Sequence, residues 1–83
     1  MKKVVTYVHM PNMSTLDYTM EYGIIAEWIK KEGEYVEKGE PLLTVETEKI
    51  VNDVNSPASG KILKILAPEG AEVPVGEKIA LIK

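Results

Sequence analysis

The sequence contains no cysteine, no arginine and no phenylalanine, and it has a single histidine, His9. The lack of cysteine excludes disulfide bridges and thiolate metal sites. A single histidine also excludes a multi-histidine metal centre and argues against a histidine-based catalytic triad. We therefore expect neither a metal ion nor a catalytic residue in this protein.

Positive charge is scarce as well, because ten lysines face thirteen acidic residues and the formal net charge is −3. Nucleic-acid binding needs a positive surface and favours the guanidinium group. No apolar run approaches the roughly 20 residues of a membrane span. Residues 1–7 also lack the apolar segment of a secretion signal. These absences predict a cytoplasmic protein that binds neither nucleic acid nor membrane.

The 83 residues are 45% hydrophobic, which suits a compact domain with a small core. The chain also repeats itself at an offset of 37 residues. Positions 23–46 align without gaps on positions 60–83, and seven of these 24 pairs are identical. Two copies are too few for a solenoid. The repeat therefore predicts one domain over residues 1–83, built from two halves that pack on each other about a dyad.

Each copy consists of short apolar stretches separated by glycine turns, which is typical of strands. The expected strands and short extended segments are Val4–His9, Gly23–Ile29, the segments around Val36 and Val73, Leu42–Val45, Ile50–Val54, Gly60–Leu66 and Ile79–Ile82. This pattern predicts an all-β fold, a flattened barrel or sandwich of two quasi-symmetric antiparallel sheets. A helix over Ala26–Glu37 is the weaker alternative, and Ser14–Asp17 could form one helical turn. Asn52 falls at an inward position, so we expect it to be hydrogen-bonded or partly exposed.

The dyad gives one lysine a special place. In the first copy the strand that ends at Val45 continues through Glu46, Thr47 and Glu48 to Lys49, whereas the second copy stops at Lys83. The first copy therefore needs a tight hairpin where the second has a terminus. We expect Lys49 at the tip of this hairpin, at the pole opposite the C-terminus. Most turn lysines are merely solvated, and flanking glutamates often only keep a strand edge soluble.

The residues around this lysine resemble the biotinyl/lipoyl attachment domain family. The resemblance rests on Gly39-Glu40-Pro41-Leu42, on Val45-Glu46-Thr47-Glu48-Lys49-Ile50, and on Ser56-Pro57 followed by Gly60-Lys61-Ile62. The lipoyl branch fits better, because its usual core is Glu-Thr-Asp-Lys, whereas the biotin branch places its lysine between methionines. The chain is similar to the N-terminal lipoyl domain of the acyltransferase (E2) component of 2-oxo acid dehydrogenase complexes.

The resemblance implies a non-catalytic carrier with lipoate joined covalently to Lys49. A lipoate ligase or lipoyl transferase would load it, and Glu46, Thr47, Glu48 and Ile50 would take part in recognition. Its further partners would be a thiamine-dependent decarboxylase (E1), the acyltransferase core and dihydrolipoyl dehydrogenase (E3) of a 2-oxo acid or acetoin dehydrogenase complex. The cofactor carries the acyl group, while the protein presents the cofactor and is recognised by the partner enzymes.

In the family, the loop before the second strand lies beside the lysine hairpin and helps the decarboxylase to select its carrier. Leu16 and Tyr18 are therefore candidate partner contacts, although they could equally cover the end of the barrel. Three other functions on the same resemblance stay open: a biotin carrier, the carrier of the glycine cleavage system, and an unmodified structural hammerhead domain.

Overall fold

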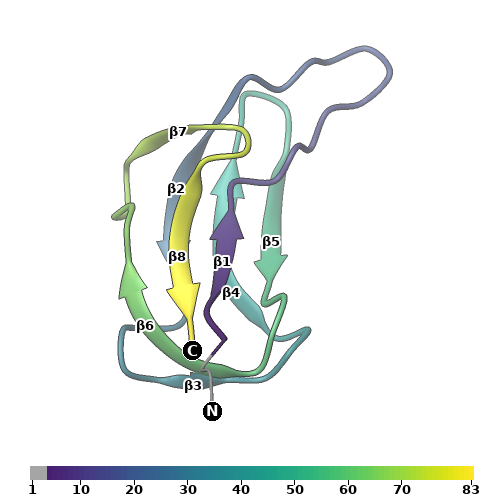
Figure 1. Cartoon of the computed structure of the whole chain (residues 1–83). Helices are drawn as coiled ribbons and strands as arrows, with labels where there is room; N and C mark the ends of the chain where they lie inside the picture. Colours follow the sequence, from purple (N-terminus) through teal and green to yellow (C-terminus); the bar gives the residue numbers. More distant parts are fainter. Residues whose placement is uncertain (1–3) are drawn as a thin grey trace.

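The computed structural model describes residues 4–83, and eight strands form two four-stranded antiparallel sheets (Figure 1). The strands are β1 (Thr6–His9), β2 (Tyr22–Trp28), β3 (Tyr35–Val36), β4 (Pro41–Glu46), β5 (Val51–Asn55), β6 (Gly60–Ile65), β7 (Glu72–Pro74) and β8 (Lys78–Ile82). One sheet has the order β1-β8-β6-β3 and the other the order β5-β4-β2-β7. The all-β prediction is confirmed, and none of the described residues belongs to a helix that could span a membrane.

The order of strands in the two sheets shows the predicted dyad. The offset of 37 residues carries β2, β3 and β4 onto β6, β7 and β8, while β1 occupies the position in its sheet that β5 occupies in the other. Backbone hydrogen bonds repeat with the same offset: the Gly33 N–H donates to the Ile62 carbonyl at 2.8 Å, and the Gly70 N–H donates to the Ile25 carbonyl at 2.7 Å. Each half of the chain therefore closes its turns on the other half.

The repeated glutamates explain part of this exchange. Carboxylate oxygens of Glu32 and Glu69 accept the backbone N–H groups of Ile65 (2.8 Å) and Trp28 (3.0 Å), each in the opposite half. These amides belong to the last residues of β6 and β2. The identity of the two glutamates in the repeat therefore reflects a shared structural task.

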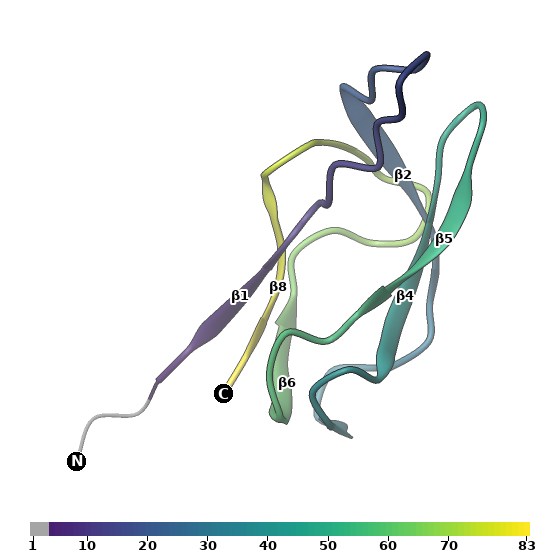
Figure 2. The same ribbon diagram turned by 90° about the vertical axis from the view of Figure 1, so that its right-hand side faces the viewer.

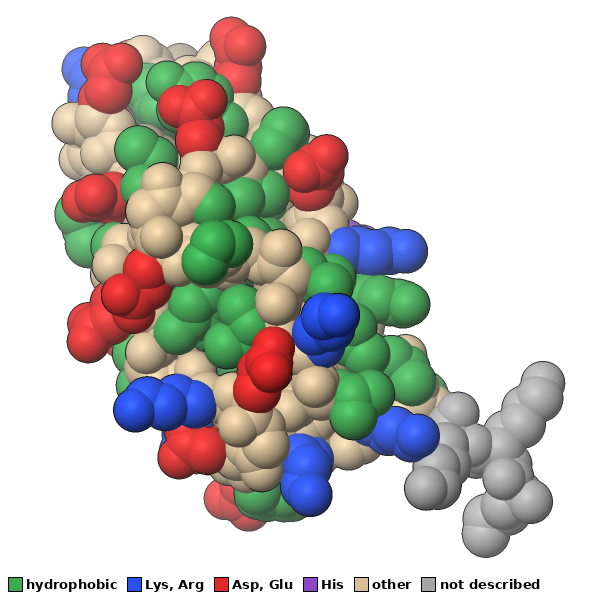
Figure 3. Space-filling model, turned by 90° about the vertical axis from the view of Figure 1, so that its left-hand side faces the viewer, with side chains coloured by type: hydrophobic (Ala, Val, Ile, Leu, Met, Phe, Trp, Pro, Cys, Tyr) green, Lys and Arg blue, Asp and Glu red, His purple; other side chains and the backbone are tan. Residues whose placement is uncertain are grey.

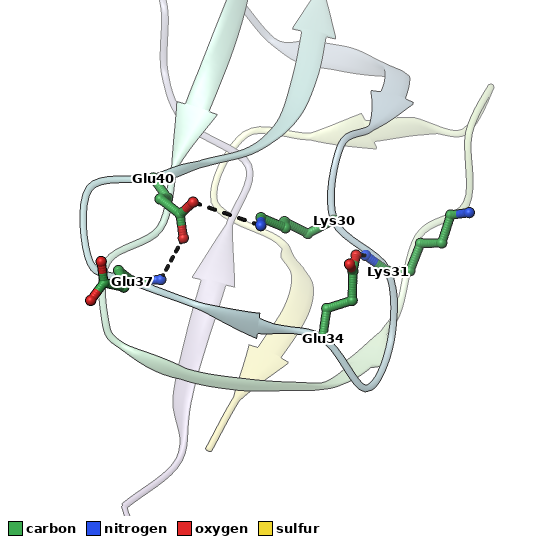
Figure 4. A network of polar contacts seen from close by, with 5 residues as sticks. All are labelled: Lys30, Lys31, Glu34, Glu37 and Glu40. Carbon is green, nitrogen blue, oxygen red and sulfur yellow. Dashed lines mark hydrogen bonds and ion pairs between the residues drawn. The ribbon is translucent and has the colours of Figure 1, made fainter.

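The turns at Gly39 and Gly76 have φ angles of +92° and +89°. Residues other than glycine rarely adopt this left-handed region, so both turns favour glycine at these positions. Near β3, at the end of the molecule where the C-terminus lies (Figure 1), further turns are closed by carboxylates. The N–H groups of Lys31 and Glu37 donate to Glu34 and Glu40, and Lys30 forms an ion pair with Glu40 at 3.7 Å (Figure 4).

A single cluster of buried side chains fills the space between the sheets. Trp28 belongs to it, and its indole N–H donates to the Ala67 carbonyl at 2.8 Å. Leu42, Leu43 and Val45 of β4 are fully buried. Asn52 is exposed on the edge strand β5, which agrees with one of the two outcomes expected for it.

Neither of the two helical alternatives occurs in residues 4–83. The segment Ala26–Glu37 contains the end of β2, a turn and β3, as the repeat favours, and no helix. Ser14–Asp17 does not form a helical turn. Instead Thr15 and Tyr18 pair across a tight turn, in which the Thr15 N–H donates to the Tyr18 carbonyl at 2.8 Å.

Candidate functional site

Lys49 lies in the tight turn that joins β4 to β5. The Thr47 N–H donates to the Ile50 carbonyl at 2.8 Å and closes the turn. The Thr47 hydroxyl oxygen also accepts the N–H groups of Lys49 (3.2 Å) and Ile50 (3.1 Å). Threonine commonly stabilises a turn by accepting the backbone amides two or three residues further along. Thr47 thus holds the backbone of the lysine in one conformation.

The turn that carries Lys49 lies at the end of the molecule opposite the C-terminus (Figure 1). Figures 1 and 2 show the β4–β5 turn at one end of the molecule, and the start of β1 and the C-terminus near the other. Lys49 is exposed, and among residues 4–83 no carboxylate lies within ion-pair distance of its amine. The two geometric expectations, exposure of the lysine and its position at the opposite pole, are confirmed.

Strand register shows why the hairpin has no counterpart. Val45 pairs with Asn52 in one sheet, and its repeat mate Ile82 pairs with Thr6 in the other. The hairpin strand β5 therefore corresponds to β1, which enters from the N-terminus. The turn that would correspond to the Lys49 turn would join β8 to β1, and in this chain β8 and β1 are not connected directly.

The loop between β1 and β2 stands beside this hairpin (Figure 2). The Asn12 carboxamide oxygen accepts the N–H of Ser14 at 3.0 Å, and the Ser14 hydroxyl accepts the N–H of Met20 at 2.8 Å. The second of these bonds ties the two arms of the loop together. At its tip the Leu16 side chain is fully exposed, with a relative accessibility of 109%. Tyr18, in contrast, is half-buried and packs against the core.

The loop and the hairpin enclose a cleft of about 240 Å³ next to Lys49. Tyr18 and Thr19 line it from the loop, and Thr47 and Glu48 line it from the hairpin. Its other lining residues are Glu21, Tyr22, Ile24 and Glu46. Apolar side chains and carboxylates thus meet in a cleft whose wall includes Glu48, the residue directly before Lys49.

The predicted site residues fall into two groups. Glu46 and Glu48 are exposed on the hairpin, whereas Thr47 and Ile50 are half-buried beneath it. Leu16 does not cover the end of the barrel, because its side chain projects away from the protein, whereas Tyr18 does pack there.

Sequence reasoning missed Glu21, Tyr22 and Ile24 as neighbours of the hairpin. One signal was present: Ile24 is an apolar residue whose repeat mate, Lys61, is charged. In the structure Ile24 pairs with Glu46 across β2 and β4, so it lies on the outer surface and reaches the cleft.

A comparison with known families decides the relationship. The biotin/lipoyl family model, described as "Biotin-requiring enzyme", matches residues 6–82. The chain belongs to the biotinyl/lipoyl attachment domain family. Within this family it is a lipoyl-type domain, as the flanks of the lysine predict and as its relatives show.

Three relatives support the lipoyl branch. The lipoyl domain of the 2-oxoglutarate dehydrogenase complex from Azotobacter vinelandii is 31% identical, with a TM-score of 0.67 over 88% of this chain and 95% of that one. The succinyltransferase component of the Rickettsia bellii 2-oxoglutarate dehydrogenase complex is 54% identical over 55 residues. The acetyltransferase component of the Corynebacterium glutamicum pyruvate dehydrogenase complex is 42% identical over 77 residues.

Each match covers most of this lipoyl-type domain but only a small part of the curated relative. It includes 66% and 93% of this chain, but only 14% of the Rickettsia protein and 11% of the Corynebacterium protein. The comparison therefore concerns a carrier domain that occurs within much longer acyltransferase components.

Proposed function

We propose that Lys49 is the lipoyl attachment residue of a swinging-arm carrier domain in the E2 component of a 2-oxo acid or acetoin dehydrogenase complex. The observation that supports this most strongly is the exposed amine at the pole opposite the termini, on a turn fixed by Thr47. An arm attached there could turn freely while the rest of the polypeptide anchors the domain at its other end.

The chemistry of the hairpin fits the cofactor. A ligase that activates lipoate must bring its carboxyl carbon to a free amine, and the Lys49 side chain has no competing ion pair among the described residues. When bound, lipoate supplies a dithiolane that accepts an acyl group as a thioester. Thr47 fixes the backbone on both sides of the attachment point, and Glu46 and Glu48 add charges by which a modifying enzyme could read the position.

The partners follow from the same proposal. Lipoate ligase or lipoyl transferase would act on Lys49, and E1, the acyltransferase core and E3 would meet the loaded arm in turn. Tethering an acyl carrier replaces a bimolecular search by a high effective concentration. Leu16, fully exposed on a loop that its own hydrogen bonds hold, is the side chain of that loop best placed to contact E1.

The experiment that tests this proposal is a ligase assay read by intact mass. Incubation with lipoate ligase, ATP and lipoate is expected to add one lipoyl group to the chain. Lys49→Arg is expected to abolish the addition, whereas Lys38→Arg, at another exposed turn lysine, leaves it intact. Incubation with biotin ligase and biotin tests the main alternative. A biotin adduct on Lys49 without a lipoyl adduct would reject the lipoyl assignment, and no adduct with either ligase would favour an unmodified structural domain.

A further inference from the structure

The two sheets have the same fold but opposite charge. Strands β1, β8, β6 and β3 contain Lys61, Lys64 and Lys78 and no acidic residue, and Lys83 directly follows β8. Strands β5, β4, β2 and β7 contain Glu27, Glu46, Asp53 and Glu72 and no lysine. All eight of these side chains are exposed. We call the outer surfaces of the two sheets the basic face and the acidic face.

The dyad places unlike charges at equivalent positions. Glu27 corresponds to Lys64 and Glu46 to Lys83 at the offset of 37 residues. Side chains that pair directly across antiparallel strands share a face of the sheet. The strand register therefore defines rows of neighbouring side chains that can be compared between the two faces. The row Tyr7–Leu81–Lys64 crosses the basic face. The equivalent row, Asp53–Thr44–Glu27, crosses the acidic face.

The basic face also exposes apolar side chains between its lysines. Tyr7, Leu63 and Tyr35 are 42%, 46% and 61% exposed on its strands, and Lys78 lies over the Tyr7 ring at 4.2 Å. A shallow hollow of about 430 Å³ opens between Lys61, Leu63 and Lys83. Figure 3 shows hydrophobic and lysine side chains along its right-hand edge and most acidic side chains toward the left and the top. Apolar groups surrounded by charges of one sign are typical of a surface that binds another protein.

We propose that the basic face is a docking surface for the acidic face of a second copy of this chain. The dyad gives both faces the same strand spacing, so the carboxylates of one copy lie opposite the lysines of the other, row by row. Each exposed ion pair is weak and is screened by salt. The contact is therefore a low-affinity one that depends on ionic strength and needs a high local concentration of domains.

This contact has two consequences for the assembly. It joins unlike faces, so each bound copy still offers one free face and the association does not close into a dimer. It also approaches the Lys49 hairpin only through Glu46, the acidic residue at the end of β4. Because the charge reversals described below leave Glu46 and the hairpin unchanged, loss of association in these variants is distinguishable from loss of Lys49 modification.

Sedimentation of the 83-residue chain at about 1 mM tests the proposal. At about 20 mM salt the apparent mass is expected to rise with concentration, and at about 500 mM salt the association should weaken at least tenfold. Lys61→Glu with Lys64→Glu reverses the basic face and should abolish association. Lys31→Glu with Lys38→Glu has the same net charge but alters turns outside both faces, and it should associate as the parent chain does.

A mixing experiment separates loss of the contact from loss of the fold. Glu27→Lys with Glu72→Lys reverses the acidic face, so this variant alone should also stay monomeric. Mixed with the Lys61→Glu, Lys64→Glu variant, it should form a complex whose affinity is at least tenfold higher than that of either variant for itself. The proposal is overturned if the parent chain is monomeric at low salt, if the turn variant loses association equally, or if the mixture does not associate. Binding of the monomeric chain to phosphatidylglycerol vesicles through Lys61 and Lys64 would assign the face to a membrane instead.

Discussion

Replacing Thr47 by valine tests how the hairpin holds its lysine. Valine keeps the shape of threonine but removes the oxygen that accepts the N–H groups of Lys49 and Ile50 at 3.2 and 3.1 Å. A hydrogen bond of this kind contributes about 0.5–1.5 kcal/mol net. Both amides are near the surface and can be rehydrated, so we expect the free energy of unfolding to fall by about 1–2 kcal/mol.

The local effect on the turn is expected to be about as large as the global one. Without the acceptor, the turn opens more often, and hydrogen exchange of the Ile50 amide should become about tenfold faster, which corresponds to about 1.4 kcal/mol. The rate of lipoylation should fall as well, because the ligase meets Lys49 in a less defined turn. Urea unfolding, amide exchange by NMR and initial ligase rates measure the three quantities.

Thr47→Ser is the matched control, because serine keeps the acceptor oxygen and loses only a methyl group. We expect its amide exchange and ligase rate to stay near those of the parent chain. Equal exchange and equal modification in the valine and serine variants would show that the hydroxyl does not hold the turn. The backbone bond from the Thr47 N–H to the Ile50 carbonyl would then be sufficient to fix the hairpin.

Three further changes test other parts of the structure. Gly23→Ala places a Cβ 2.8 Å from both Val45 Cγ1 and Met20 Cε, so we expect the free energy of unfolding in urea to fall by about 1–3 kcal/mol; an unchanged value would refute the clash. Trp28→Phe removes the hydrogen bond to the Ala67 carbonyl and should cost about 1–3 kcal/mol; an unchanged melting temperature would contradict this. Lipoylation of Lys49 removes one positive charge from a chain of net charge −3, so unchanged mobility on a native gel would contradict modification of the amine.

The fold could be predicted from the sequence because the identical residues of the repeat occupy positions where the backbone conformation or a backbone hydrogen bond restricts the residue type. Gly39 and Gly76 adopt positive φ, and Glu32 and Glu69 accept amides of the opposite half. Such positions tolerate few substitutions, so they show the offset even where the strands between them have diverged. The missing second copy of the hairpin then locates Lys49 without any further information.

The loop between β1 and β2 was less predictable. Ser14–Asp17 has the composition of a helix start, but Ser14 uses its hydroxyl to accept the distant Met20 amide, and Thr15 pairs with Tyr18. Local propensity cannot foresee bonds that close a loop on itself. The cleft escaped prediction for a similar reason, since Tyr22 and Glu48 meet only after β2 and β4 have paired.

The charge difference between the sheets is a property of the three-dimensional arrangement. In the sequence Glu27 and Lys64 are two ordinary charged residues in a mixed surface. Only the strand order places the lysines of β6 and β8 on one face and the carboxylates of β2 and β4 on the other. Strand order across a sheet involves long-range pairing, which periodicity alone does not give.

The most direct test of the central claim is a lipoylation assay on a variant that exchanges the order of two residues at the hairpin tip. Glu48→Lys with Lys49→Glu keeps the composition, net charge and number of lysines of the chain. We predict that it folds, as judged by circular dichroism, and that intact mass and peptide mapping find no lipoyl group, whereas the parent chain carries one on Lys49. Full modification of the exchanged lysine, or modification of any other lysine in the parent chain, would contradict the account.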